Sequence, residues 1–513
     1  MVGDRFFKQV IFSSLFLPIC FGVLLLFGAL PKVFAQDAER ITRTWPEPAI
    51  TQHKISLEGK RYDYRAEAGH LLLHNAKGKV VGRIFYTSYT VENDGPNRPI
   101  TFVFNGGPGS SSVWLHMGAL GPKRVFMNEN GLPPAPPYKV VDNEYSWLNE
   151  TDLVFIDPIE TGFSRPEDGE SKSQFTGVSE DVQSVGDFIR HYVSKENRWA
   201  SPKYLAGESY GTTRAAGLSG YLQDRHGMFL NGIVLISAVL NFQTLAFHDG
   251  NDLPHALFLP SFAAAAWAHN KVDRNRFPNL KNFLEEVEQY ALGVYTLFLN
   301  KGDRLSMEER KELGEQLAIY TGLSENFLAS HHYRLSTWMF TKELLRDEGF
   351  TVGRFDALIK GRDKKPAGDS YDFDPSYNLS IFGPYTMAIN DHLRNHLNFK
   401  WDETVYEILT GNVHPWNYGS AQNRYLNVAE TLRNAIHKNK DLKVLICSGY
   451  YDLATPYFAT DYTVNHMFIA PEFRDNIQTR YYEGGHMMYT IPKELEQFTK
   501  DVRAFYSGNR SKK

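Results

Sequence analysis

Short apolar runs recur along the chain and predict strands that are buried on both faces. The runs are nearly continuous in apolar side chains and occupy residues 100–104, 153–157, 203–207, 232–236 and 443–447. Runs of this length without alternation are typical of a mostly parallel sheet covered by helices. Residues 178–193 carry apolar side chains at helical spacing and predict a helix that crosses between two of these strands. The pattern therefore predicts an α/β fold with a central, mostly parallel sheet flanked by helices.

The segments around these runs have a different hydrophobic periodicity, which divides the chain into parts. Residues 54–105 carry a period-two pattern, which is typical of an antiparallel meander. Residues 244–420 lack the buried runs and show helical spacing, with a helix expected to open around Pro260 and a capping box at Ser306 and Glu309. We therefore expect a first part of the core with the N-terminal meander over 36–243, a helical cap insertion over 244–420, and a second part of the core over 421–513.

The first 35 residues predict a signal peptide. Arg5 and Lys8 precede an uncharged apolar stretch over residues 10–30, and Ala35 ends a Val-Phe-Ala sequence suited to cleavage before Gln36. The alternative is an uncleaved membrane anchor, because the apolar stretch is long enough to span a bilayer. We expect cleavage, export, and no stable membrane association afterwards.

Composition narrows the class of protein. The 513 residues are 42% hydrophobic and carry a formal net charge of −4, so no basic excess points to nucleic acid. Only two cysteines are present, Cys20 within the predicted signal peptide and Cys447, which excludes a fold built on disulfides. His331 and His332 are adjacent but lack a third ligand nearby, so we predict no metal site, and no cofactor motif stands out.

A nucleophile elbow follows the third apolar run. Gly207-Glu208-Ser209-Tyr210-Gly211 has the Gly-x-Ser-x-Gly pattern and precedes a stretch rich in small residues. This strand-turn-helix context projects the serine hydroxyl above a sheet, and glycines allow the strand and the helix to approach closely. Ser209 is therefore the candidate nucleophile.

A general base and an orienting carboxylate are expected later in the chain. A serine nucleophile needs both, and on such a sheet they follow in the order serine, acid, histidine. Asp452 comes shortly after the fifth apolar run, and His486 follows a short strand-like segment and two glycines. Both residues therefore occupy the expected places.

A glycine-rich loop after the first apolar run is suited to an oxyanion hole. Asn105-Gly106-Gly107-Pro108-Gly109 allows close approach of backbone N–H groups to a developing negative charge. The N–H groups of Gly107 and of Tyr210, the residue after the nucleophile, are the expected donors. A phosphate-binding loop is excluded because no P-loop lysine follows.

Four motifs together resemble the serine carboxypeptidase family of the α/β-hydrolase fold. They are Asn105-Gly-Gly-Pro-Gly-Ser-Ser-Ser112, Asp157-Pro-Ile-Glu-Thr-Gly-Phe-Ser164, Gly207-Glu-Ser-Tyr-Gly211 and Gly485-His-Met487. The resemblance implies a peptide substrate, a catalytic triad, two oxyanion donors and a site for the substrate's terminal carboxylate. The triad would be Ser209, Asp452 and His486, the donors Gly107 and Tyr210, and the carboxylate-binding residues Asn105, Gly106 and Glu208. Binding through Glu208 requires one carboxyl to be protonated, so acidic pH should favour it.

The chain also departs from the family pattern. Ala119 stands where many members have a second glutamate, and Ser110 stands where many have cysteine. We interpret the differences as marks of a bacterial exported branch, periplasmic or secreted.

Glu208 has an alternative role as a carboxylate at a helix N-terminus. An esterase or acyltransferase with the same triad, or a catalytically idle envelope binding protein, are the alternative functions.

Overall fold

The computed structural model describes residues 43–92, 95 and 97–510. The chain divides into two compact units, Met1–Thr44 and Trp45–Lys513, and every helix and strand below belongs to the second. The predicted signal peptide lies outside the described residues. Within the described ranges, no helix combines the length and the apolar character needed to cross a bilayer.

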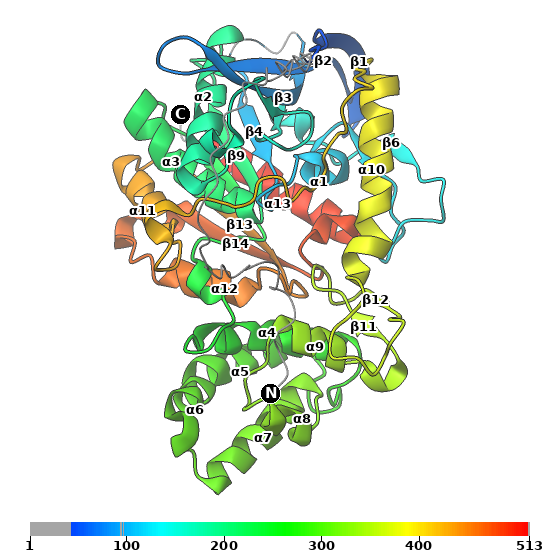
Figure 1. The fold of residues 1–513 in the computed structure, drawn as a ribbon, viewed down its shortest axis with the longest axis vertical. Helices are drawn as coiled ribbons and strands as arrows, with labels where there is room; N and C mark the ends of the chain where they lie inside the picture. Colours follow the sequence, from blue (N-terminus) through cyan, green and yellow to red (C-terminus); the bar gives the residue numbers. More distant parts are fainter. Residues whose placement is uncertain (1–42, 93–94, 96, 511–513) are drawn as a thin grey trace, which may run out of the picture. The chain divides into compact units, whose positions relative to one another are not determined.

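A mostly parallel sheet forms the centre of this unit and has ten strands over the described residues (Figure 1). The strand order is β1-β2-β3-β7-β4-β9-β10-β13-β14, with β8 paired to β3. Strands β1 to β3 form an antiparallel meander, β3 pairs antiparallel with β7, and all pairs from β7 to β14 are parallel. The bounds are β1 Ala49–Leu57, β2 Lys60–His74, β3 Val80–Val91, β4 Ile100–Phe104, β7 Asp152–Ile156, β8 Arg165–Pro166, β9 Lys203–Glu208, β10 Gly232–Ile236, β13 Lys443–Gly449 and β14 Ile477–Tyr482.

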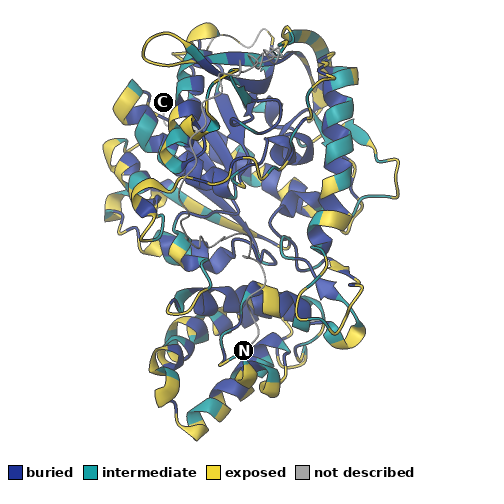
Figure 2. Ribbon diagram, viewed as in Figure 1, coloured by how far each residue is buried: buried dark blue, intermediate teal, exposed yellow. Residues whose placement is uncertain are grey.

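Helices cover both faces of the sheet because alternate side chains of each buried strand point to opposite layers. In β10, Ile233 and Leu235 pack with α2, α3 and α11, whereas Val234 and Ile236 pack in the layer that contains α13. The strands between these layers are buried along their length (Figure 2). The helix bounds are α2 Val178–Lys195, α3 Tyr210–His226, α11 Ala429–Lys438, α12 Tyr457–Asn465 and α13 Pro492–Arg510. The sequence prediction of an α/β fold with a helix-covered parallel sheet is confirmed.

The chain between β10 and β13 is an insertion between neighbouring strands, and most of its helices gather beside α12 (Figure 1). Their side chains form an apolar cluster with Tyr457 and Phe458 of α12. In contrast, Tyr385 and Ile389 of α10 pack in the layer that contains α13. The bounds are α4 Leu253–Ala268, α5 Leu280–Tyr290, α6 Thr296–Lys301, α7 Met307–Thr321, α8 Glu325–Ser330, α9 Thr337–Glu343 and α10 Phe382–Asp391.

Two local predictions in this insertion had different outcomes. The capping box is present: the Ser306 side chain accepts from the Glu309 N–H, and the Glu309 carboxylate accepts from the Ser306 N–H. The helix expected to open around Pro260 instead begins at Leu253, so that prediction is wrong. Pro254 occupies the first turn, where a missing N–H costs little, and Pro260 lies inside a helix that packs into an apolar cluster.

Candidate active site

Ser209 lies on a sharp turn between β9 and α3. Its backbone has φ 59° and ψ −129°, a conformation that residues with a Cβ rarely adopt. The turn is tight enough to require its glycines: a Cβ on Gly211 would lie 2.8 Å from the Phe104 carbonyl oxygen, and one on Gly207 would collide with the Gly211 carbonyl. The strained turn presents the Ser209 side chain at the carboxyl edge of the parallel strands, as a nucleophile elbow does.

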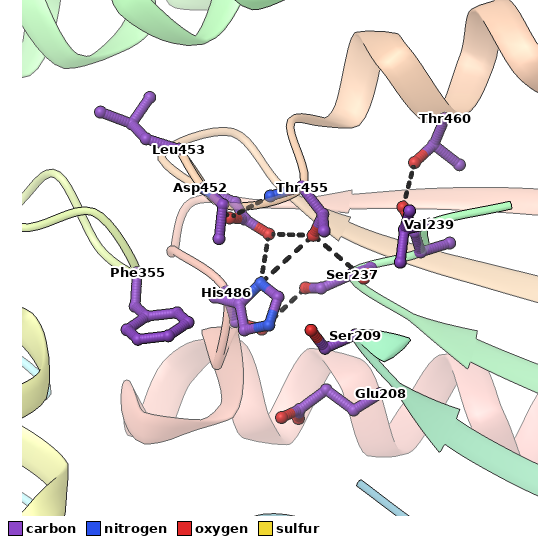
Figure 3. A network of polar contacts seen from close by, with 12 residues as sticks. Glu208, Ser209, Ser237, Val239, Phe355, Asp452, Leu453, Thr455, Thr460 and His486 are labelled. Atoms are coloured by element: carbon purple, nitrogen blue, oxygen red, sulfur yellow. Dashed lines mark hydrogen bonds and ion pairs between the residues drawn. The ribbon is translucent and has the colours of Figure 1, made fainter. Parts of the chain in front are cut away.

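His486 and Asp452 meet at the same edge, from the loops after β14 and β13. The Nδ1 atom of His486 lies 2.7 Å from Oδ2 of Asp452, and both side chains are buried. The other carboxylate oxygen of Asp452 accepts from the N–H groups of Ala454, at 2.7 Å, and Thr455, at 2.9 Å. In Figure 3 the imidazole lies between Asp452 and Ser209. Ser209, His486 and Asp452 are far apart in sequence and thus come together in the arrangement of a serine, histidine and aspartate triad.

Hydrogen bonds to the backbone fix the orientation of the histidine. The Ser237 hydroxyl donates to the His486 carbonyl at 2.7 Å, and the His486 N–H donates to the Phe355 carbonyl at 2.5 Å. The Phe355 ring stands 5.2 Å from the imidazole (Figure 3). Burial acts to lower the pKa of His486, but the Asp452 carboxylate and the nearby Glu208 raise it, and the net pKa is raised. Because the ionised Asp452 carboxylate can only accept, the His486 nitrogen that faces it, Nδ1, carries the proton.

The glycine-rich loop after β4 lies directly against the elbow. A Cβ on Gly106 would lie 2.9 Å from Ser209 Cβ and would collide with the N–H of Tyr210, so only glycine fits. Gly107 has φ +103°, again a conformation suited to glycine. Gly107, Tyr210 and Ser209 line the same cavity, which places the two expected oxyanion donors beside the nucleophile.

Glu208 carries a buried carboxyl immediately beside the nucleophile. Asn105 Nδ2 donates to its Oε1 at 3.0 Å, and the Tyr489 hydroxyl donates to its Oε2 at 2.5 Å. Burial raises the pKa of Glu208 to about 7, although the His486 charge and the bonds from Tyr489 and Asn105 oppose the rise. Glu208 is therefore a carboxyl that changes its charge near neutral pH rather than a solvated helix-terminal carboxylate.

These groups surround one cavity of about 460 Å³. Trp114, Phe355, Tyr377 and Met487 line it, and Phe242 lines it beside Tyr210. Of the residues predicted from sequence, Gly106, Gly107, Glu208, Ser209, Tyr210 and His486 line the cavity, while Asn105 and Asp452 lie behind Glu208 and His486. All the predicted site residues are thus brought together.

Sequence reasoning missed three contributors to this site. The Thr455 hydroxyl lies 2.8 Å from Asp452 Oδ2 and 3.2 Å from His486 Nδ1, and only its spacing from Asp452 hinted at this. Tyr489 is a hydrogen-bond partner of Glu208, and no sequence pattern indicated that role. Phe355 carries no sequence signal, because it reaches His486 from within the insertion.

No group of three or more His, Cys, Asp or Glu side chains with the geometry of a metal site occurs in the described part of the chain. The chemistry open to the arrangement is nucleophilic: a hydroxyl, an imidazole held by a carboxylate, and two N–H groups facing one space.

Known proteins share both the sequence pattern and the fold. The profile of the family described as "Serine carboxypeptidase" matches residues 57–499. Serine carboxypeptidase-like 35 of Arabidopsis thaliana is 27% identical over 414 residues, which are 76% of this chain and 73% of that protein. Carboxypeptidase Y homolog A of Trichophyton rubrum is 28% identical over 179 residues, 33% of this chain and 31% of that protein.

The chain spans less than a third of the length of three matching proteins that are named Carboxypeptidase Y homolog A. Among solved structures, the prohormone-processing carboxypeptidase KEX1(delta)p of Saccharomyces cerevisiae has a TM-score of 0.53 and 16% identity, covering 87% of this chain and 91% of that one. That likeness confirms the predicted α/β-hydrolase type of fold. Because the family profile covers most of the sequence, the chain belongs to the serine carboxypeptidase family.

Proposed function

We propose that this protein is a serine carboxypeptidase that releases the C-terminal residue of peptides through an acyl-enzyme. The observation that carries the proposal is the buried carboxyl of Glu208, held by Asn105 and Tyr489 in the same cavity as Ser209 and His486. A triad alone suits many acyl transfers, whereas a protonatable carboxyl beside the nucleophile suits a substrate that ends in a carboxylate.

In the acylation step Ser209 Oγ attacks the carbonyl carbon of the last peptide bond. His486 Nε2 takes the hydroxyl proton, and Asp452, bonded to Nδ1 at 2.7 Å, stabilises the imidazolium that forms. The carbonyl oxygen becomes negative and accepts from the N–H groups of Gly107 and Tyr210. The imidazolium then gives its proton to the leaving amine, the C–N bond breaks, and the shortened peptide remains esterified to Ser209.

Deacylation repeats these events with water as the nucleophile. His486 takes a proton from water as the oxygen attacks the ester carbonyl, and the same two N–H groups stabilise the second oxyanion. The proton then returns to Ser209 as the ester bond breaks. The free acid leaves, and the enzyme is restored.

The carboxyl of Glu208 selects the free C-terminus. In its protonated form it donates a hydrogen bond to the substrate's terminal carboxylate, and Asn105 and Gly106 border the same position. In its ionised form it repels that carboxylate. Because the pKa of Glu208 is raised to about 7, binding of peptide acids should hold at acidic pH and weaken as the pH rises through that value.

The charge of Glu208 also affects the base. Ionised Glu208 is one of the groups that raise the pKa of His486, whereas protonated Glu208 has no charge to contribute. The acidic form of Glu208 therefore favours both substrate binding and a neutral imidazole. This coupling supports activity at acidic pH in spite of the raised pKa of His486.

Processing and location complete the proposal. We infer that residues 1–35 are a cleaved signal peptide, that the core over 36–243 and 421–513 carries a cap over 244–420, and that the enzyme belongs to a bacterial exported branch and acts in the periplasm or outside the cell. The sequence of the first 35 residues supports export. Cys447 is buried and unpaired among the described residues, so stability rests on core burial.

The experiment compares a blocked dipeptide acid, its C-terminal amide and the matching ester from about pH 4 to pH 8, around the raised pKa of Glu208. We expect the wild type to prefer the acid, the preference to fade with rising pH, and Ser209→Ala to be inactive on all three.

Each alternative has its own result in the same comparison. Equal rates on acid and amide at every pH would refute the carboxylate-binding role of Glu208. Turnover of the ester without the acid would indicate an esterase or acyltransferase that uses the same triad. Activity that survives Ser209→Ala would refute the mechanism, and a folded wild type that is inactive on every substrate would support the idle binding protein.

A further inference from the structure

A guanidinium group lines the cavity next to the residues that hold the triad. Arg354 is half-buried and is one of the cavity's lining residues. Its guanidinium carbon lies over the ring of Phe355, at 5.1 Å, and over that of Trp338, at 5.6 Å. Within the described residues, no side chain forms a hydrogen bond or an ion pair with this guanidinium. A half-buried cation that lies over two aromatic rings and forms no such pair still has its donors available for an anion.

The backbone around Arg354 is fixed to the loops of the active site. The Leu453 N–H, next to Asp452, donates to the Arg354 carbonyl at 3.0 Å, and the Phe355 carbonyl accepts from the His486 N–H. On the other side, the Arg354 N–H donates to the Asp374 carboxylate at 3.3 Å. The position of Arg354 is therefore tied to that of the triad, although it belongs to the insertion between β10 and β13.

Aromatic rings follow one another along the cavity wall and end at the guanidinium. The ring centres of Trp114 and Tyr377 are 6.3 Å apart, as are those of Tyr377 and Phe355, and all three residues line the cavity. The centre of the Phe355 ring lies 5.2 Å from that of the His486 imidazole and 5.1 Å from the guanidinium carbon. The same ring is therefore a neighbour of both the imidazole and Arg354.

Arg354 is also the one permanent cation among the residues that line the cavity. The other ionisable lining groups are Glu208, His414, His486 and the phenols of Tyr210 and Tyr377. The carboxylate of Asp374, which accepts from the Arg354 N–H, also accepts from the hydroxyl of Ser376, at 2.5 Å, and from the Ser376 N–H. The cavity thus offers an unused positive charge to whatever lies along the aromatic wall.

We propose that Arg354 binds the side-chain carboxylate of the residue to be released, so that the enzyme prefers peptides ending in glutamate or aspartate. The inference rests on the proposed function, in which Glu208, held by Asn105, binds the terminal carboxylate. The side chain of that same residue then lies along the wall of Trp114, Tyr377 and Phe355, which leads to the guanidinium. A bidentate guanidinium–carboxylate pair forms there, shielded by the rings.

The test measures kcat/KM for blocked dipeptide acids that differ only in the last residue: Glu, Gln or Lys. At about pH 6 a glutamate side chain in solution is ionised, while Gln has the same shape without the charge. The enzymes are the wild type, Arg354→Gln, Arg354→Lys and Arg362→Gln. Arg362 is the matched control, because its guanidinium also lies on a ring, that of Phe350, but is not part of the cavity.

We expect the wild type to favour Glu over Gln by about tenfold or more, as for a charge-assisted pair, and the ratio to decrease with added salt. Arg354→Gln should bring the ratio near one, Arg354→Lys should retain part of it, and Arg362→Gln should match the wild type. An unchanged ratio in Arg354→Gln, with C-terminal residues still released, would overturn the inference and leave the proposed function intact.

A binding measurement tests the role of Arg354 without any turnover of substrate. Calorimetry on Ser209→Ala, with and without Arg354→Gln, compares the affinities for the Glu and Gln dipeptides. Tighter binding of Glu that depends on Arg354 supports the site. If the folded wild type releases no C-terminal residue from any peptide, the proposed function fails, and this calorimetric comparison decides the role of Arg354 by itself.

Discussion

The Tyr489 hydroxyl donates a 2.5 Å hydrogen bond to Glu208 Oε2 inside the active site. The Tyr489 ring fills the space beside the segment that carries Ala119, since a Cβ on Gly118 would lie 2.6 Å from it. Burial and the neighbouring Glu208 raise the pKa of Tyr489 well above its usual value, so the phenol keeps its proton and remains a donor. A tyrosine, rather than a second carboxyl, is therefore the partner of Glu208.

Tyr489→Phe should move the pH dependence of peptide-acid hydrolysis upward. The lost bond favours the ionised form of Glu208, so without it the pKa of Glu208 rises further above about 7 and the protonated form persists to higher pH. The alkaline limb of kcat/KM should shift up by about half a unit to one unit. Tyr385→Phe is the control, because Tyr385 is buried nearby without a hydrogen bond to Glu208 in the described part of the chain. An unshifted limb would contradict the role of Tyr489.

Glu208→Gln should change how stability depends on pH. The folded-state pKa of Glu208 lies above its ordinary value of 4.5, so the folded protein binds the proton more tightly than the unfolded chain. Stability is therefore lost as the pH rises from about 4.5 to about 7, by up to about 3 kcal/mol. Urea unfolding at pH 5 and pH 8 should show a smaller difference in the variant than in the wild type. An equal difference in both proteins would mean that Glu208 does not titrate as described.

Ser209→Ala and Ser209→Gly should both be inactive but differ in stability. Each removes the nucleophile, which lowers kcat by about 10⁵-fold or more. The backbone at residue 209 has φ 59°, which glycine adopts freely and alanine does not, so the glycine variant should be more stable by about 1 kcal/mol or more. Denaturant midpoints measure the difference. Equal stabilities would argue against strain at the elbow.

Thr455→Val should lower kcat by about tenfold and leave KM nearly unchanged. The Thr455 hydroxyl lies 2.8 Å from Asp452 Oδ2 and 3.2 Å from His486 Nδ1, so it positions the base and not the substrate. Asp452→Asn should lower kcat by about 10⁴-fold, as expected when the histidine tautomer is lost. Thr460→Val is the control, since the Thr460 hydroxyl is also buried but donates to the Ala238 carbonyl. Similar losses in both threonine variants would indicate general destabilisation.

Much of the fold could be predicted because burial on both faces leaves a local trace. The runs over 100–104 and 232–236 coincide with β4 and β10, since strands between two helical layers need apolar side chains at nearly every position. The start of α4 could not be read in this way. Pro254 and Pro260 are both suited to the first turn of a helix, so the local sequence does not say which one stands there. The helix begins before Pro254, and its packing in the apolar cluster holds Pro260 inside it.

The sequence by itself determined the triad candidates, the oxyanion loop and Glu208, because each stands next to glycines or at the end of a strand, where the backbone conformation restricts the residue type. Only the tertiary structure decided which side chains surround them. Tyr489 reaches Glu208 across 281 positions, and Arg354 and Phe355 reach the cavity from the insertion. Such contacts depend on how separate elements pack, and no local pattern in the sequence records them.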